Sequence, residues 1–270
     1  GACRRLGTAG PAGAGVWFAA AGGLISAGLC LLDVGGPLSV LNMLRVFKYQ
    51  SPMSVGAWIL PRFGTCAVPA CVAYELHYNH FFTGGLDTFM KIVAILLIIG
   101  SAFWGLGLAT YTGVLIGATV VPAWFLHRVL LPIHFGTAGL GCAVSILELM
   151  GFHLRPLFFL LMFTAVIETL LWIWLELDKH GPADAALHHG TAGWLIRGGE
   201  FLCGPLPLIL GLTNLLPFAT ISFIVGAFCR DFGWINAVRA SGQHPDAVFS
   251  LPARAVHSPT LPTTKDRTKV

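Results

Sequence analysis

Three polar side chains stand inside long apolar stretches of this sequence: Arg62, Tyr111 and Glu168. If each stretch is a helix that rises about 1.5 Å per residue, they lie about 12, 15 and 14 Å from helix ends on one side, at one level. A charge near the centre of a bilayer costs about 2.5–3.5 kcal/mol or more, so Arg62 and Glu168 are expected to pair with each other rather than face lipid. We therefore predict a proton-relay or charge pair of Glu168 and Arg62. Asp33, at a helix end on the same side, would continue the route to water.

The same residues allow purely structural roles. Tyr111 could be a packing aromatic whose hydroxyl bonds a neighbouring carbonyl, and Arg62 with Glu168 could be a buried pair that only fixes helix packing. Both alternatives remain open on the sequence alone.

Histidines and cysteines are distributed in a way that disfavours a bound metal. Haem ligation in a membrane needs two axial residues that face each other, and of the ten histidines only His134 falls clearly within an apolar stretch. The seven cysteines are scattered without a C-x-x-C pair, which is typical of small core residues. The sequence therefore predicts no haem or metal in this chain.

The composition is that of a membrane protein. Of 270 residues, 56% are hydrophobic and 10% are charged, far from the proportions of a soluble domain. Apolar runs of about 20 residues, the length that crosses a bilayer, recur along the chain and predict an all-α polytopic transmembrane helix bundle. We expect about seven spans, near residues 12–32, 54–75, 91–121, 131–150, 156–177, 197–213 and 215–231. The third is long, and we expect one tilted helix because no polar turn divides it.

The predicted bundle covers residues 1–235, and residues 236–270 form an extramembrane tail. This tail has little apolar periodicity, so it is expected to be partly disordered. Its basic residues suit membrane lipid or an acidic partner and not nucleic acid, because aromatic residues are not interleaved with them. The excess of Lys and Arg at this end predicts a cytoplasmic C-terminus.

Several motifs occur in an order that resembles the NrfD family, the membrane subunits of polysulfide reductase and related (PsrC-like) complexes. The most specific is Ser-Pro-Met-Ser-Val-Gly-Ala-Trp at 51–58, in which Ser51 would cap a helix that starts at Pro52. The other matching segments are Leu-Leu-Asp-Val-Gly-Gly-Pro at 31–37, Tyr-Thr-Gly at 111–113, Pro-Ala-Trp at 122–124, Arg-Ala-Ser at 239–241 and Asp-Ala-Val-Phe at 246–249.

The resemblance implies a quinone-binding subunit of a respiratory oxidoreductase complex, without haem or flavin and not catalytic alone. Its partners would be an iron–sulfur ferredoxin-like subunit and a molybdopterin or multihaem catalytic subunit, and its location the bacterial cytoplasmic (inner) membrane. Its cofactor would be menaquinone or ubiquinone, whose ring oxygens need hydrogen-bond partners. The implied binding residues are Tyr111, Thr112, Ser51, Ser54 and Trp58, of which the last three also fit a helix cap and an interfacial anchor.

The sequence also departs from the family pattern. Gly36 and Gln50 stand where the family usually has Arg, which removes two cations from the loop expected to face the iron–sulfur partner. The family has eight helices, and this chain resembles that bundle without its first helix. The alternatives from other classes are a secondary transporter or proton-conducting membrane protein, for which Arg62 and Glu168 would be the substrate or proton site, and a passive membrane anchor. Inverted repeats typical of transporters are not evident.

Overall fold

The computed structural model describes residues 10–33, 51–119, 121–177 and 190–242, and these residues form helices joined by short turns, without a strand among them. The predicted all-α membrane bundle is confirmed. In chain order the helices are α2 (Gly10–Asp33), α4 (Pro52–Tyr78), α5 (Gly85–Gly117), α6 (Pro122–Leu126), α7 (Leu130–Leu149), α8 (Arg155–Leu177), α10 (Gly190–Cys203), α11 (Pro205–Leu212) and α12 (Leu216–Gly242).

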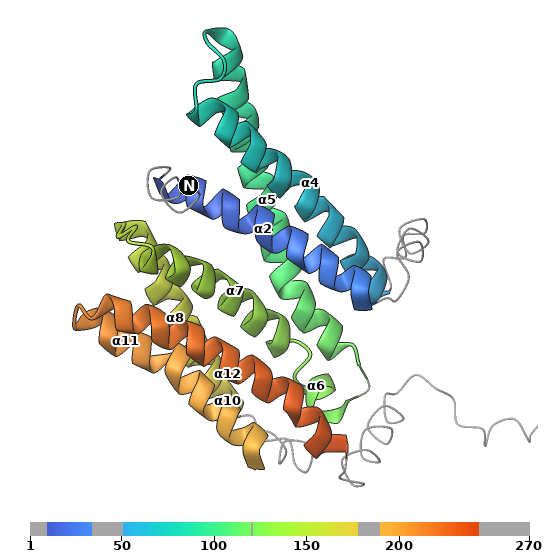
Figure 1. Ribbon diagram of the computed structural model, residues 1–270. Coiled ribbons are helices and arrows are strands. Elements are labelled where there is room, and N and C mark those ends of the chain that lie inside the picture. The colour runs from blue at the N-terminus through green and yellow to red at the C-terminus, as the bar shows by residue number, and fades with distance from the viewer. Residues whose placement is uncertain (1–9, 34–50, 120, 178–189, 243–270) are drawn as a thin grey trace, which may run out of the picture.

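Seven spans in the described residues are long and apolar enough to cross a membrane, as predicted, which makes the chain a multi-pass membrane protein. The third is one helix, α5, of 33 residues. At about 50 Å it exceeds the roughly 30 Å hydrocarbon layer, so it must tilt or project. Figure 1 shows the hairpin of α4 and α5 extending beyond the neighbouring helices.

Several boundaries differ from the prediction, and the third span is Gly85–Gly117 rather than 91–121. The sixth span starts at Gly190 rather than near 197, because Arg197 is accommodated by Glu176 of α8, 2.8 Å away. The last helix runs to Gly242, past the expected boundary at 235, because its polar end keeps its helical hydrogen bonds, and Asn236 donates to the Phe232 carbonyl at 3.0 Å. The predicted disorder of 243–270 and the motif positions 34–37, 50 and 246–249 lie outside the described residues.

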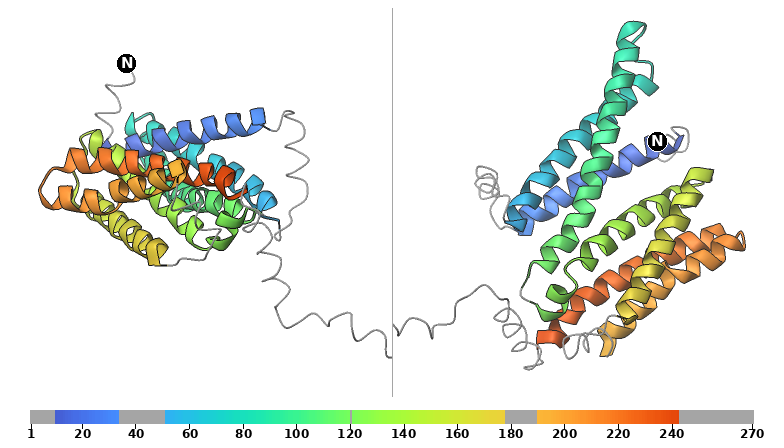
Figure 2. Two further views of the ribbon diagram at one scale, coloured as in Figure 1. Left: turned by 90° about the horizontal axis from the view of Figure 1, so that it is seen from below. Right: turned by 180° about the vertical axis from the view of Figure 1, so that it is seen from behind.

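The helices form two groups (Figures 1 and 2). The first helix group consists of α2, α4 and α5, and the second of α7, α8, α10, α11 and α12. Small residues join them where α5 crosses α7: a Cβ on Gly113 would lie 2.5 Å from the Leu131 backbone, and one on Gly136 would lie 2.6 Å from Thr110. Such positions let membrane helices approach closely, so the α5–α7 contact fixes how the two groups meet.

Helix α4 begins where the sequence predicts. Ser51 is extended (φ −101°), its carbonyl accepts a 3.1 Å hydrogen bond from the Val55 amide, and Pro52 is the first helical residue. The Ser51 side chain, however, makes no capping hydrogen bond. The proline therefore defines this start more than the serine hydroxyl does.

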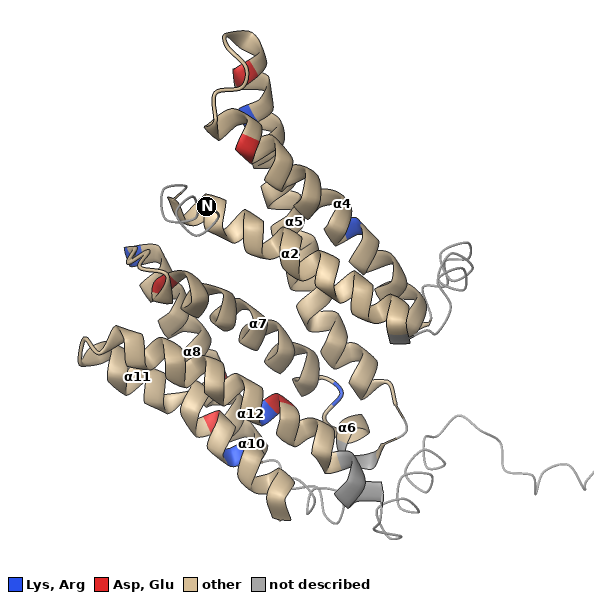
Figure 3. Cartoon of the chain, in the orientation of Figure 1, with Lys and Arg blue, Asp and Glu red and all other residues tan. Residues whose placement is uncertain are grey.

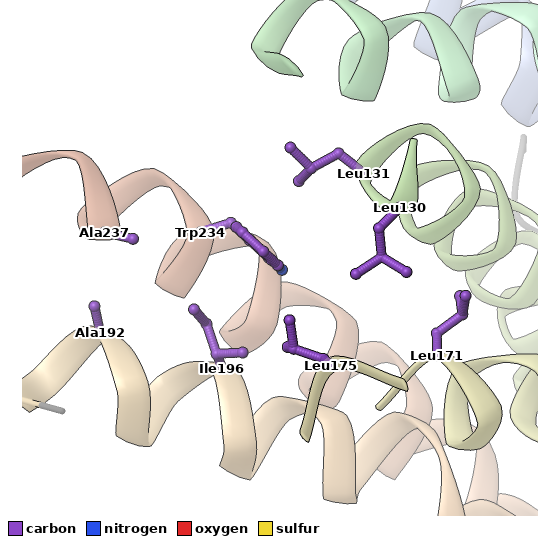
Figure 4. Close-up of a cluster of buried hydrophobic side chains, with 8 residues drawn as sticks. All are labelled: Leu130, Leu131, Leu171, Leu175, Ala192, Ile196, Trp234 and Ala237. Carbon is purple, nitrogen blue, oxygen red and sulfur yellow. The ribbon is translucent and has the colours of Figure 1, made fainter. Parts of the chain in front are cut away.

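The second helix group contains most of the apolar core. At its end nearest the start of α7, Trp234 and Ala237 of α12 point toward Ala192 and Ile196 of α10 (Figure 4). Charged residues are sparse along all the helices (Figure 3), so those that do lie inside the bundle need partners.

Candidate functional site

Four helices of the second group each contribute one ionisable side chain to a common interior point. These residues, which we term the buried cluster, are His134 of α7, Glu168 of α8, Glu200 of α10 and Arg230 of α12, each 0% exposed. Ionisable groups inside a membrane protein are costly and mark functional sites unless they are fully paired.

Glu168 is the centre of the buried cluster. One carboxylate oxygen, Oε2, accepts a hydrogen bond from Arg230 and lies 2.9 Å from His134 Nδ1. The other oxygen, Oε1, accepts a hydrogen bond from the Thr137 hydroxyl. Both oxygens are thus satisfied, and the carboxylate is held in one orientation.

Arg230 links this carboxylate to a second one nearer the surface. Its Nε and Nη2 donate to Asp231 Oδ1 at 3.1 and 3.0 Å, and the Asp231 side chain is 29% exposed. Its Nη1, which donates to Glu168, also lies 3.7 Å from Cys203 Sγ. The guanidinium therefore links Glu168 in the interior to Asp231. Among the described residues, Asp231 is the one partly exposed acid that contacts the buried cluster.

Glu200 is the unsatisfied member. In the part of the chain that the structure describes, neither of its oxygens has a hydrogen-bond partner, and the same holds for His134 Nε2. These groups face each other at 3.6 Å, too far for a hydrogen bond. Nδ1 lies 2.9 Å from Glu168 Oε2 and 3.3 Å from Arg230 Nη1. The carboxylate contact is the shorter, so we assign the imidazole proton to Nδ1, which leaves a lone pair on Nε2 opposite the Glu200 carboxylate. The His134–Glu200 pair can therefore take up one further proton or cation.

Two glycines explain why α10 and α12, which carry Glu200 and Arg230, come so close. A Cβ on Gly199 would lie 2.5 Å from the Arg230 backbone nitrogen, and one on Gly226 would lie 2.5 Å from the Cys203 backbone nitrogen. The backbones of α10 and α12 thus touch along this seam.

The sixth span breaks one turn after Glu200. Helix α10 ends at Cys203, and α11 starts at Pro205 after Gly204 (φ −99°, ψ −95°). A Cβ on Gly204 would lie 2.9 Å from both the Glu200 carbonyl and Thr169 Oγ1. Broken membrane helices occur where backbone is enclosed by protein, as here, and often beside a binding site.

The buried cluster offers three potential metal ligands, His134, Glu168 and Glu200, with ligand atoms within 4.8 Å of one another. Glu168 Oε2, however, is already used by Arg230 and His134. Free lone pairs remain on His134 Nε2 and Glu200, fewer than the three or four protein ligands that zinc sites usually have. The geometry suits a proton better than a metal ion.

The predicted pair of Arg62 and Glu168 is wrong. Glu168 pairs with Arg230, whereas Arg62 is exposed and lies over the rings of Trp58 and Trp104, 5.7 and 5.0 Å from their centroids. Equal predicted depth in the membrane does not bring two side chains together, and Arg62 and Glu168 do not meet because α4 and α8 belong to different helix groups. Asp33 is the last residue of α2, and the predicted role of its side chain in the route to water lies outside what the structure describes.

The structure does bring two of the motifs together. The half-buried Tyr111 ring of α5 packs directly on Gly56 of the 51–58 motif: a Cβ there would lie 1.9 Å from the ring. Thr112 is exposed and its hydroxyl donates to the Leu108 carbonyl at 3.3 Å, inside its own helix. Ser51 and Ser54 are half-buried at the start of α4, and Trp58 follows one turn later under Arg62.

Sequence reasoning missed His134, Glu200 and Arg230 as site residues. His134 was visible as a histidine within a span, but Glu200 stood near an expected helix start and Arg230 near an expected helix end. Glycines at 199 and 226 were the available signal, because closely packed membrane helices use small residues there.

Comparison of the chain with protein-family models, with curated proteins and with solved structures gives no match. The resemblance to the NrfD family therefore stays a prediction.

Proposed function

We propose that this chain is a quinone- or quinol-binding membrane subunit of a bacterial respiratory oxidoreductase complex, which exchanges electrons with an iron–sulfur partner subunit. One observation carries the proposal: the two segments most similar to the NrfD family, 51–58 and 111–113, pack on each other through Tyr111 and Gly56. Any side chain at position 56 would occupy the volume of the Tyr111 ring. This is a physical reason for the 51–58 and 111–113 motifs to occur in one chain.

The seam between α4 and α5 has suitable chemistry for a quinone head group. Tyr111 is half-buried, and its phenol can donate a hydrogen bond to a ring oxygen. Trp104 lies about two turns before Tyr111 on α5, and with Trp58 it holds the Arg62 guanidinium. Aromatic rings, the Arg62 cation and the Tyr111 phenol thus lie along the α4–α5 seam, which would border on lipid.

The proposed cofactor is menaquinone or ubiquinone, and the proposed location is the bacterial inner membrane. A molybdopterin or multihaem subunit would complete the complex. Ser51, Ser54 and Trp58 would lie near the end of the quinone site, where α4 starts, and Thr112 would contribute less because its hydroxyl is bonded within α5.

Substitution of Tyr111 by Phe tests this proposal. The ring keeps its place on Gly56 and only the hydroxyl is lost, so quinol oxidation by the intact complex should fall by about 10²-fold, the scale of one positioned proton-transfer group. Tyr78→Phe, a change near the end of α4, is the matched control and should leave turnover unchanged.

Assembly is followed by co-purification of the iron–sulfur subunit. Unchanged turnover of assembled Tyr111→Phe complex would favour a passive anchor, and solute uptake by the isolated chain would favour a transporter.

A further inference from the structure

One face of α7 carries polar residues along its whole length. His134, Thr137, Ser145 and Glu148 follow each other at helical spacing with Gly141 between them, and Ser145 and Glu148 are as enclosed as His134. From His134 to Glu148 the helix rises about 21 Å, most of the thickness of a bilayer. This face therefore connects two ends of the second helix group, which we term the His134 end and the Glu148 end.

The Glu148 end reaches water through His153. Glu148 Oε2 lies 2.9 Å from His153 Nδ1, and the His153 side chain is 62% exposed. Glu148 Oε1 and the Ser145 hydroxyl have no hydrogen-bond partner within the described part of the chain. Unused donors and acceptors thus point into the bundle from this end.

The His134 end reaches the surface through Asp231, as described above. Arginine does not release its proton, so Arg230 holds Glu168 and Asp231 in place and does not carry protons itself. The group that can bind and release a proton here is the pair of Glu200 and His134 Nε2.

A cluster of buried apolar side chains lies between the two ends. It consists of Val144, Leu161, Ala165, Cys203 and Phe223. The Phe223 ring fills the place that a side chain at Gly141 would take, since a Cβ there would lie 2.2 Å from the ring. Gly141 is about 10 Å along α7 from both His134 and Glu148, so Phe223 stands midway between them.

From this arrangement we propose that the inward face of α7 is a proton path across the membrane, with a proton-binding site at His134–Glu200 and a plug formed by Phe223 on Gly141. A proton that enters past Asp231 binds to Glu200 or to His134 Nε2 and neutralises or protonates that group. When the Phe223 ring swings away and water takes its place, the proton leaves toward Ser145 and Glu148 and exits at His153. Its departure returns Glu200 or His134 to the starting protonation state.

A purely structural polar network would satisfy its members. Here the described residues leave polar atoms unbonded on both sides of the plug, at Glu200 and His134 Nε2 on one side and at Ser145 and Glu148 on the other. Unbonded polar atoms in an apolar interior are costly, which favours sites that water or a proton visits. The inference does not depend on quinone binding.

Removal of the plug provides the test. The full chain is reconstituted in liposomes that contain a pH-sensitive dye, and a potassium gradient with valinomycin drives proton uptake. Phe223→Ala should raise the initial uptake rate by at least about tenfold, because the vacated volume admits water. Phe218→Ala, on the same helix at a 62% exposed position, is the matched control and should equal the unmodified chain.

The route is then tested by second substitutions. Phe223→Ala/Glu200→Gln and Phe223→Ala/Glu148→Gln should both return the uptake rate to that of the unmodified chain, while sodium permeability stays unchanged in every variant. Uptake that is not raised by Phe223→Ala, that survives both glutamine substitutions or that comes with sodium leakage would overturn the proposal.

A graded series covers the case in which Phe223→Ala does not fold. Phe223→Leu and Phe223→Val, checked for a single peak by size-exclusion chromatography in detergent, should raise uptake in the order of decreasing side-chain size. Rates equal to the unmodified chain across folded members of this series would also contradict the plug. Since no quinone or partner subunit is present, failure here leaves the quinone proposal untouched, and the reverse also holds.

Discussion

At the scale of single residues, the buried cluster depends on compensation of charge. Glu168 receives hydrogen bonds from Arg230 and Thr137 and contacts His134, so removal of its guanidinium partner leaves a charged group in an apolar interior. Breaking one side of a buried ion pair costs more than the pair itself contributes, because the remaining charge keeps its desolvation penalty.

Arg230→Met is therefore expected to destabilise the folded chain by about 3–5 kcal/mol. Glu168→Gln in the same chain should recover part of this loss, since it removes the orphaned charge. The measurement is thermal unfolding in detergent.

Arg128→Met is the matched control. This arginine is exposed and lies 5.1 Å over the Phe125 ring, so its loss should change stability little. Equal effects of the two arginine substitutions would mean that Arg230 is not paired as described.

At the scale of helices, sequence reasoning succeeded where local composition decides the structure. Seven spans, the single long α5 and the start of α4 at Pro52 were predicted, because apolar length and a proline are local properties. Sequence reasoning also recognised that Glu168 needs a cationic partner. The sequence predicted Arg62 as this partner instead of Arg230. The correct partner depends on which helices are neighbours, and the distance of a residue from its helix end does not contain that information.

The contact between α10 and α12 makes its own prediction. Gly199→Ala places a methyl group 2.5 Å from the Arg230 backbone, so the two helices must separate and stability should fall by about 1–3 kcal/mol. The adjacent Gly198 has nothing within 4 Å of the added Cβ, so Gly198→Ala should be neutral or slightly stabilising in a helix.

The melting temperatures of both variants in detergent give the comparison. A Gly198→Ala protein that is the less stable of the two would refute the close packing of this seam.

At the scale of the whole molecule, the two helix groups divide the proposed tasks. The α4–α5 seam of the first group would bind quinone, and the second group contains the buried cluster and the polar face of α7. The α5–α7 contact is the main junction between them, so a movement at Tyr111 would reach the second group mainly through that contact. Smaller links run from α2 to α7 and through α6, which touches both α5 and α12.

If α7 crosses the membrane, cysteines introduced at its two ends should be labelled from opposite sides. Cysteine introduced at Ala118, before α6 and α7, and cysteine introduced at Leu154, after α7, should each react with a membrane-impermeant maleimide, one from outside right-side-out vesicles and the other only after permeabilisation. The unmodified chain, with its natural cysteines, gives the background. Labelling of both positions from one side would exclude α7 as a membrane-crossing path.

The break between α10 and α11 has an electrical consequence. Pro205 and Pro207 have no amide hydrogen, so the carbonyls of Phe201 and Cys203 in the last turn of α10 lose their usual helical partners. The Leu202 carbonyl in the same turn accepts a hydrogen bond from the Ser222 hydroxyl at 2.6 Å. The negative pole of the α10 peptide dipoles thus ends inside the protein near Arg230, instead of at the membrane surface. The main chain itself thereby adds a fixed attraction for positive charge at mid-bundle, which substitution of the acidic side chains would leave in place.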